Sequence, residues 1–184
     1  TSMAISGISS GWIQPTFSED KLDMDITTAA AQYEEATHFF LNLVNGLSEE
    51  ALDISDGEGW TPRQVIHHVA DSEAQSYARL RRLVAEPGTI IQGYDEGAWG
   101  ENSTLGYTQL PIDISVAVFT AVRASTLEII KRLTDEQLNN SGTHSESGEY
   151  TVRNWLDNYI SHPRDHASQI QKIESKVADA APQA

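Results

Sequence analysis

The stretch VRNWLDNYISHPRDHASQIQKIESKV, residues 152–177, decides the fold class because it carries one stripe at alternating steps of three and four. That spacing places all members of the stripe on one face of a helix. Two histidines one turn apart fall on the same apolar face, where imidazoles need partners. The stripe consists of Val152, Trp155, Tyr159, His162, His166, Ile170, Ile173 and Val177. The pattern predicts a long amphipathic helix that carries two imidazoles on its buried side.

Pro163 follows His162 directly and interrupts this helix. Proline has no backbone N–H, so the carbonyl of Tyr159, four residues earlier, loses its helical donor. In one interpretation the helix bends around its neighbours and the freed carbonyl binds a water. In the other, the bend sets the angle between the two imidazoles for a metal ion. The sequence leaves both interpretations open.

Three more amphipathic stripes precede this helix. The first covers about residues 26–47, the second about residues 61–86, and the third begins after Pro111. The second opens with Thr61 and Gln64 at the spacing of a capping box, which marks a helix start. Few strand signals are present. Four amphipathic helices in one chain predict an all-α fold, a four-helix bundle.

The connection between the second and third helices, from about Pro87 to Leu110, is long. A helix of about 25 residues is about 37 Å long, and an extended connection of this kind can span that distance. The two helices are therefore predicted to run parallel, which gives an up-down-down-up bundle with a long crossover. We expect the bundle to occupy residues 21–177, with flexible segments at 1–20 and 178–184.

Composition excludes several classes of function. The chain has 184 residues and a net charge of −15, which argues against nucleic acid or an anionic membrane surface as a partner. It has no cysteine, so it has no disulfide framework, thiolate nucleophile or cysteine-ligated zinc site. No apolar run approaches the roughly 20 residues of a membrane span. The opening residues do not resemble a signal peptide, and we expect a cytoplasmic protein.

A third histidine on another helix strengthens the case for a metal. The stretch VIHHVADSE contains His67 and His68, and His68 is four residues before Ser72 on the inward stripe of its helix. His67 points about 100° away from His68. His68 is therefore the better candidate for the interior. We predict that His67, like His38 and His144, lies at the surface.

Three inward histidines from two helices predict an open metal site. His68, His162 and His166 would supply three ligands, and the small side chains of Ser72 and Ser76 would leave room beside them. Catalytic sites keep a coordination position for water or substrate, whereas closed structural sites do not. The alternative is that the histidines are core residues with backbone partners.

Two polar residues are spaced to orient the metal ligands. Asp71 follows His68 by one turn and Gln169 follows His166 by one turn, so each could accept a hydrogen bond from the second ring nitrogen. Solvated or capping roles are the alternative for both residues.

Other residues are candidates for substrate binding. Arg123 interrupts the apolar face of the third helix, and a buried arginine needs an anionic partner. That partner is either an anionic group of the substrate or an acidic residue of the chain. In the long connection, Tyr94, Asp95 and Trp99 could form a lid over the cavity.

The stretches GWTPRQVIHHVADSE and HPRDHASQI, taken together, resemble the DinB-like superfamily, in particular its YfiT-type branch. The segment YDEGAW, residues 94–99, is also similar to that branch. The resemblance implies a four-helix bundle with a crossover and a divalent metal held by three histidines, which correspond to His68, His162 and His166. The chain departs from the pattern at Asp165, where members often carry a further histidine, and at Pro163.

The resemblance also implies an activity. It points to thiol S-transferases, in which the metal activates a low-molecular-weight thiol for attack on an electrophile. The absence of cysteine fits this reaction, because the sulfur would come from the cosubstrate. A metal-dependent hydrolase that uses metal-activated water is the alternative, and a non-catalytic metal-binding or stress-response scaffold is another. We expect zinc, with nickel next, a small-molecule substrate and a possible homodimer.

Overall fold

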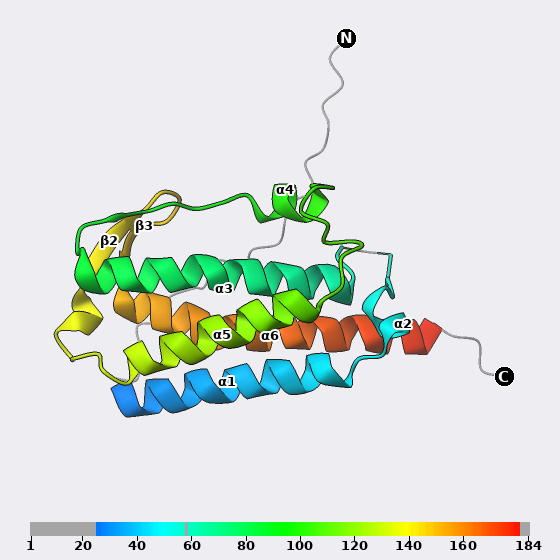
Figure 1. Ribbon diagram of the computed structural model, residues 1–184, viewed down its shortest axis with the longest axis horizontal. Helices are drawn as coiled ribbons and strands as arrows, with labels where there is room; N and C mark the ends of the chain where they lie inside the picture. Colours follow the sequence, from blue (N-terminus) through cyan, green and yellow to red (C-terminus); the bar gives the residue numbers. More distant parts are fainter. Residues whose placement is uncertain (1–24, 58, 181–184) are drawn as a thin grey trace, which may run out of the picture.

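Four long helices pack side by side along the molecule (Figure 1). The computed structural model describes residues 25–57 and 59–180, so the predicted flexible segment at 1–20 lies outside the described residues. The four helices are α1 (Ile26–Gly46), α3 (Pro62–Ala85), α5 (Asp113–Ile130) and α6 (Val152–Ala180). The predicted bundle is confirmed. Helix α6 continues through residues 178–180, which were expected to belong to a flexible tail.

The order and direction of the helices also agree with the prediction. In Figure 1, α1 and α6 run in one direction and α3 and α5 run in the other. The chain leaves the end of α3 and returns along the bundle before α5 begins, which is the predicted crossover. This connection is not structureless, because it contains the short strand β1 (Ile90–Ile91) and the short helix α4 (Glu96–Glu101).

A small sheet at one end of the bundle was not expected. Strand β1 pairs in parallel with β2 (Ser141–His144), which pairs antiparallel with β3 (Gly148–Thr151). Strands of two and four residues are too short to show an alternating pattern, so they could not be predicted from the sequence. The remaining short elements are α2 (Glu49–Leu52) and the 3₁₀ turn η1 (Gln137–Asn139).

Side-chain caps fix where the two histidine-bearing helices begin. At the start of α3, the Thr61 N–H donates to Oε1 of Gln64 at 3.0 Å, and the Gln64 N–H donates to Oγ1 of Thr61 at 3.4 Å. This is the predicted capping box. At the start of α6, Thr151 and Asn154 exchange equivalent bonds of 3.0 and 3.1 Å. The helical period is constant, so a defined first residue determines which face of the helix each later side chain occupies.

The hydrophobic side chains form two clusters with a polar layer between them. One cluster packs around Trp155 and the other around Phe119. On every long helix, polar side chains stand between the residues of the two clusters. They are Thr37 on α1, Ser72, Glu73 and Ser76 on α3, Arg123 and Thr126 on α5, and His162 on α6. The middle of the bundle is therefore polar.

Arg123 ties all four helices together within this layer. Its guanidinium is 1% exposed and lies 3.0 Å from Oε1 of the buried Glu73. Its other bonds go to the backbone carbonyl of Tyr33, at 2.7 Å, and to Oγ1 of Thr37, at 2.8 Å. The expectation that Arg123 binds a substrate is therefore wrong, because the chain itself supplies the acidic partner. The other alternative, that Arg123 pairs with an acidic residue of the chain, is the one that the structure shows.

The same guanidinium explains how the helix accommodates Pro163. Nη1 of Arg123 donates to the backbone carbonyl of Tyr159 at 2.6 Å. This is the carbonyl that Pro163 leaves without a helical donor, and α6 continues through the proline. The freed acceptor is satisfied by a side chain from α5.

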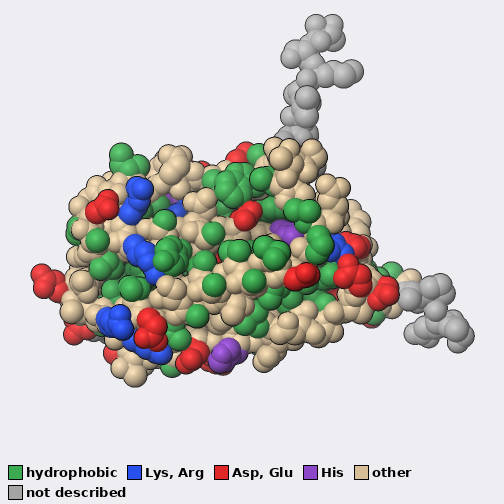
Figure 2. Space-filling model, viewed as in Figure 1, with side chains coloured by type: hydrophobic (Ala, Val, Ile, Leu, Met, Phe, Trp, Pro, Cys, Tyr) green, Lys and Arg blue, Asp and Glu red, His purple; other side chains and the backbone are tan. Residues whose placement is uncertain are grey.

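The outer face of α3 and α5 carries hydrophobic side chains, which gather over the middle of the molecule in Figure 2. The exposed large hydrophobic residues of these two helices are Tyr77 on α3 and Ile114 and Val118 on α5. None of the described helices has the length and apolar character that crossing a membrane requires. The homodimer and the cytoplasmic location stay predictions.

Candidate metal centre

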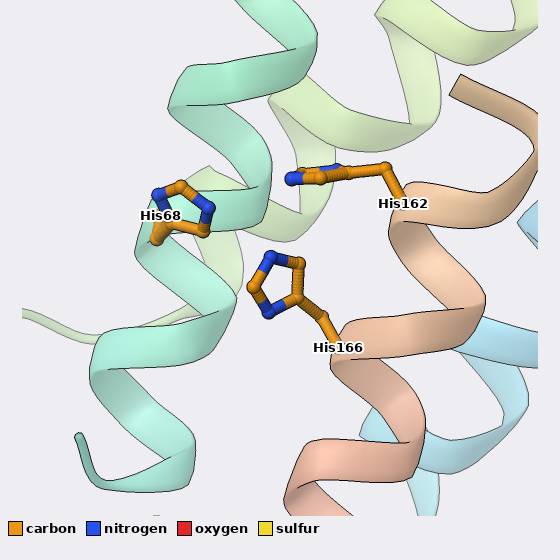
Figure 3. A group of neighbouring side chains, drawn as sticks. All are labelled: His68, His162 and His166. Atoms are coloured by element: carbon orange, nitrogen blue, oxygen red, sulfur yellow. The ribbon is translucent and has the colours of Figure 1, made fainter. Parts of the chain in front are cut away.

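Three imidazoles from two helices point toward one another (Figure 3). His68 comes from α3, and His162 and His166 come from adjacent turns of α6. One ring nitrogen from each residue lies within 4.8 Å of those of the other two. The ring centroid of His68 is 5.4 Å from that of His162 and 4.8 Å from that of His166. The side chains predicted as a ligand set are thus brought together.

Several nitrogens of this group have no partner within the described part of the chain. Nδ1 of His68 and both ring nitrogens of His162 are buried without a hydrogen bond. Leaving a buried polar atom unpaired costs about 1–3 kcal/mol. A divalent ion would take one nitrogen of each imidazole, and imidazole is a common ligand for such ions. The donor set therefore fits a metal.

The environment keeps the imidazoles in the form that binds metals. Burial lowers the pKa of His68 to about 3, and neighbouring His166 contributes to this shift. Burial also lowers the pKa of His162 well below its usual value, with smaller contributions from the two other imidazoles and from Arg123. For His166, burial lowers the pKa while the bond to Gln169 opposes the change. Neutral imidazoles have a lone pair free for a metal.

The two residues expected to orient the ligands behave differently. Oε1 of Gln169 lies 2.8 Å from Nδ1 of His166, which favours a proton on Nδ1 and leaves Nε2 for the metal. Asp71 does not reach His68. Its Oδ2 accepts a hydrogen bond of 2.5 Å from the Tyr107 hydroxyl, so the structure contradicts the expected role of Asp71.

A carboxylate that sequence reasoning missed stands beside the centre. Oε2 of Glu96 lies 3.6 Å from Nε2 of His68, and the Glu96 side chain is 17% exposed. Glu96 belongs to α4, which packs on Trp60 through Gly100. A Cβ added at Gly100 would stand 2.7 Å from Cζ2 of Trp60, so only glycine permits this approach. The signal in the sequence was the segment YDEGAW, which contains Glu96 between the predicted lid residues.

The lid residues predicted around Glu96 have separate positions. Asp95 caps α4 by accepting a hydrogen bond of 2.9 Å from the Ala98 N–H, so its carboxylate has a structural role. The rings of Tyr94 and Trp99 pack against each other, with centroids 4.6 Å apart. Tyr94 has a buried hydroxyl without a partner in the residues described. Tyr94 therefore places a buried hydroxyl just before α4.

His67 corrects another prediction. It was expected at the surface but is 5% exposed. Its Nδ1 lies 2.7 Å from Oγ of Ser115, and its Nε2 lies 3.0 Å from the backbone carbonyl of Leu110. Both partners come from the region where α5 begins, which covers this side of α3. His67 is therefore a buried histidine with two protein partners, unlike its neighbour His68.

The other predictions about the surroundings have mixed outcomes. His38 is exposed, as predicted, whereas His144 is half-buried. Ser76 does not open space beside the centre. Its hydroxyl donates to the backbone carbonyl of Glu73 at 2.8 Å, so it belongs to the Arg123 network.

An up-down-down-up bundle with three convergent imidazoles defines a class of helical proteins with a histidine metal centre. The family model of the DinB superfamily matches residues 32–170. The chain belongs to the DinB superfamily.

Similar proteins carry names that refer to metal-dependent hydrolysis. A protein of Oceanobacillus iheyensis, named "putative metal-dependent hydrolase", is 32% identical over 143 residues, which cover 77% of this chain and 81% of that protein. A protein of Bacillus cereus strain G9842 with the same name is 29% identical over 153 residues, which cover 83% and 87%. The solved structure of YfiT from Bacillus subtilis is 26% identical and has a TM-score of 0.77. The match covers 88% of this chain and 92% of YfiT, which is described as a probable metal-dependent hydrolase with an unusual four-helix bundle topology.

Proposed function

We propose that this protein is a metal-dependent hydrolase in which His68, His162 and His166 hold one divalent ion. The observation that carries the proposal is the convergence of three nitrogens within 4.8 Å, in a group that includes buried nitrogens without a partner. The names of the similar proteins point to the same class of reaction. An ion held there would act as a Lewis acid and would lower the pKa of a bound water to near neutral.

The number and type of ligands support a catalytic role. Structural zinc sites use four protein ligands, whereas catalytic sites use three and leave a position for a reactant. The group here offers three histidines and no cysteine. Zinc is the metal we favour, with nickel next, since imidazole binds both.

Glu96 is the candidate for proton transfer. Its carboxylate lies next to His68 and is largely covered by protein, so it stands where a nucleophile beside the metal would release a proton. A positioned carboxylate that accepts such a proton contributes about 10²–10⁴-fold to a rate. The variant Glu96→Gln should therefore keep its metal and lose at least about 100-fold in turnover.

Transfer of a low-molecular-weight thiol is the second candidate. The observation that favours it is the complete lack of cysteine in the chain, which leaves the sulfur nucleophile to a cosubstrate. The same three histidines would hold the ion, and Glu96 would accept the thiol proton in place of the proton of water.

One set of assays separates these functions. Zinc-loaded protein is given p-nitrophenyl acetate without thiol and, separately, 1-chloro-2,4-dinitrobenzene with 2-mercaptoethanol. Hydrolysis predicts ester turnover without thiol that disappears in His166→Ala and persists in His38→Ala, whose side chain is exposed. Turnover only in the presence of thiol would replace the first proposal by the second. A protein that holds zinc and turns over neither substrate would favour a scaffold.

A further inference from the structure

Arg79 is a half-buried arginine on α3, and its partners differ from those of the fully buried Arg123. It follows His68 by eleven residues on α3, which places it about 20° from His68 around the helix. Nη1 donates to the Tyr159 hydroxyl at 3.3 Å, and Nη2 donates to the backbone carbonyl of Gln92 at 2.8 Å. Its Nε is buried and has no partner in the described residues.

Arg79 has no acidic partner among the described residues, which it shares with Arg81, whose bonds also go to neutral oxygens. Aspartate and glutamate number 27 against 12 lysines and arginines, so carboxylates are abundant. Arg63, Arg123 and Arg164 all lie within 4.0 Å of a carboxylate. Among residues 25–57 and 59–180, no carboxylate makes such a contact with Arg79. A guanidinium with a buried, unpaired N–H and no counter-charge is suited to an anionic ligand.

A second unpaired donor stands near Arg79. The hydroxyl of Tyr94 is buried and has no close hydrogen-bond partner in the part of the chain that the structure describes, although a weaker interaction with the Ser72 hydroxyl acts on it. Burial raises the pKa of Tyr94, the Glu96 carboxylate raises it further, and Ser72 and Arg79 oppose the change. The tyrosine is therefore within electrostatic reach of the carboxylate beside the metal centre and of Arg79.

Tyr159 connects Arg79 to the metal centre from the other helix. It precedes His162 by three residues on α6, and the two rings have centroids 5.8 Å apart. Its hydroxyl accepts the bond from Arg79 and can still donate its own proton. Arg79, Tyr94 and Tyr159 come from three different segments of the chain, and Tyr159 links this group to His162.

We propose that Arg79, Tyr94 and Tyr159 form a subsite that binds a carboxylate group of the molecule on which the metal centre acts. Its link to catalysis rests on the proposed function, whereas binding of a carboxylate does not. One guanidinium and two neutral hydroxyls supply a single positive charge, which matches a carboxylate better than a dianion such as phosphate. The substrate class is thus a small carboxylic acid or amino acid derivative.

The length of α3 restricts the shape of this substrate. The Cα atoms of His68 and Arg79 are roughly 16 Å apart along the helix axis. Helical side chains lean toward the N-terminus, which brings the guanidinium back toward His68. A substrate that spans both sites therefore has several bonds between its carboxylate and the group that reacts.

Nuclear magnetic resonance of the arginine Nε–H groups tests the subsite directly. Uniformly ¹⁵N-labelled protein is titrated with sodium propionate and, separately, with sodium chloride at the same ionic strength. The Arg79 signal is assigned by its disappearance in Arg79→Lys. We expect it to shift with propionate in a saturable way and not with chloride. The Arg123 signal is an internal control and should not move, because its Nε–H already donates to Thr37.

Two variants extend the experiment. Tyr94→Phe removes one hydroxyl and should raise the fitted Kd for propionate about tenfold. Tyr77→Phe, on the exposed face of α3, is the matched control and should bind like wild type. The Arg79 shift should also persist in His68→Ala, so the subsite is observed even if the protein binds no metal. An Arg79 signal that propionate leaves unmoved, or that chloride moves equally, would overturn the subsite. A Tyr94→Phe variant with an unchanged Kd would overturn its composition.

Discussion

The two polar groups in the middle of the bundle differ in one respect: whether the protein itself satisfies them. Around Arg123, the guanidinium has an acidic side chain, a hydroxyl and two backbone carbonyls as partners. Around His162, both ring nitrogens are buried and unpaired in the residues described. Buried polar groups are normally satisfied. A satisfied group therefore indicates a structural role, and an unsatisfied one indicates a ligand.

The proline in α6 links the two groups. Pro163 leaves the Tyr159 carbonyl for Arg123, which lies on one side of α6, while His162 and His166 face α3. The helix thus gives up one internal hydrogen bond and gains a contact to α5. Arg123 thus contacts the helix turn that precedes His162.

The largest expected effect comes from breaking the satisfied group. Arg123→Met leaves Glu73 buried without its counter-charge, so the free energy of unfolding should fall by about 3–5 kcal/mol. Urea denaturation measures the change. Arg132→Met is the control, since its side chain is 75% exposed, and it should cost under about 1 kcal/mol. An Arg123→Met protein as stable as the control would show that the network is not structural.

The next largest effect concerns the three-histidine group, which includes buried nitrogens without a partner in the described residues. Zinc at 100 times its Kd should raise the free energy of unfolding by about 2.7 kcal/mol, because it binds the folded chain. Thermal denaturation with zinc and with EDTA measures the difference. His166→Ala should lose this increment and His38→Ala should keep it. A zinc increment that survives in His166→Ala would mean that the ion binds elsewhere.

A smaller effect distinguishes the groups in metal-free protein. His162→Leu removes two buried, unpaired nitrogens and should leave the protein as stable as wild type or about 1 kcal/mol more stable. His67→Leu should instead destabilise it by about 1–3 kcal/mol, because Ser115 loses its partner and the Leu110 carbonyl keeps only its bond from Arg63. Urea denaturation in EDTA compares them. A larger loss of stability in His162→Leu than in His67→Leu would contradict the distinction between satisfied and unsatisfied buried groups.

The smallest effect is expected at Pro163, which lies between the Arg123 network and the three-histidine group. Pro163→Ala restores a backbone N–H, and the Tyr159 carbonyl has two lone pairs, so it can accept this donor together with Arg123. The free energy of unfolding should change by less than about 1 kcal/mol, and zinc affinity should stay within a factor of about three. Urea denaturation and zinc titration test both. A large loss of zinc affinity would favour the interpretation that the proline sets the angle between the imidazoles.

Local patterns in the sequence predicted much of this architecture. The stripe along α3 distinguished His68 from His67, and the spacing of Thr61 and Gln64 predicted where that helix begins. Helical periodicity also placed His162 and His166 on the inner face of α6, since the period of a helix is constant.

Contacts between distant segments were not predictable in the same way. Glu73 and Arg123 are 50 residues apart, and nothing local shows that they pair. Glu96 reaches His68 only because a six-residue helix in the crossover packs on Trp60. His67 was misjudged because its partners come from the region where α5 begins. Such positions depend on how the helices pack, which periodicity does not encode.

Metal content is the measurement that tests the central claim most directly. The protein is purified without a metal-affinity tag, incubated with zinc, dialysed and measured by elemental analysis, beside His68→Ala and His166→Ala. His38→Ala is the control, because its histidine is exposed. The account predicts about one zinc ion per chain in wild type and His38→Ala, and almost none in the two centre variants. Wild-type protein without metal, or centre variants that keep it, would contradict the account.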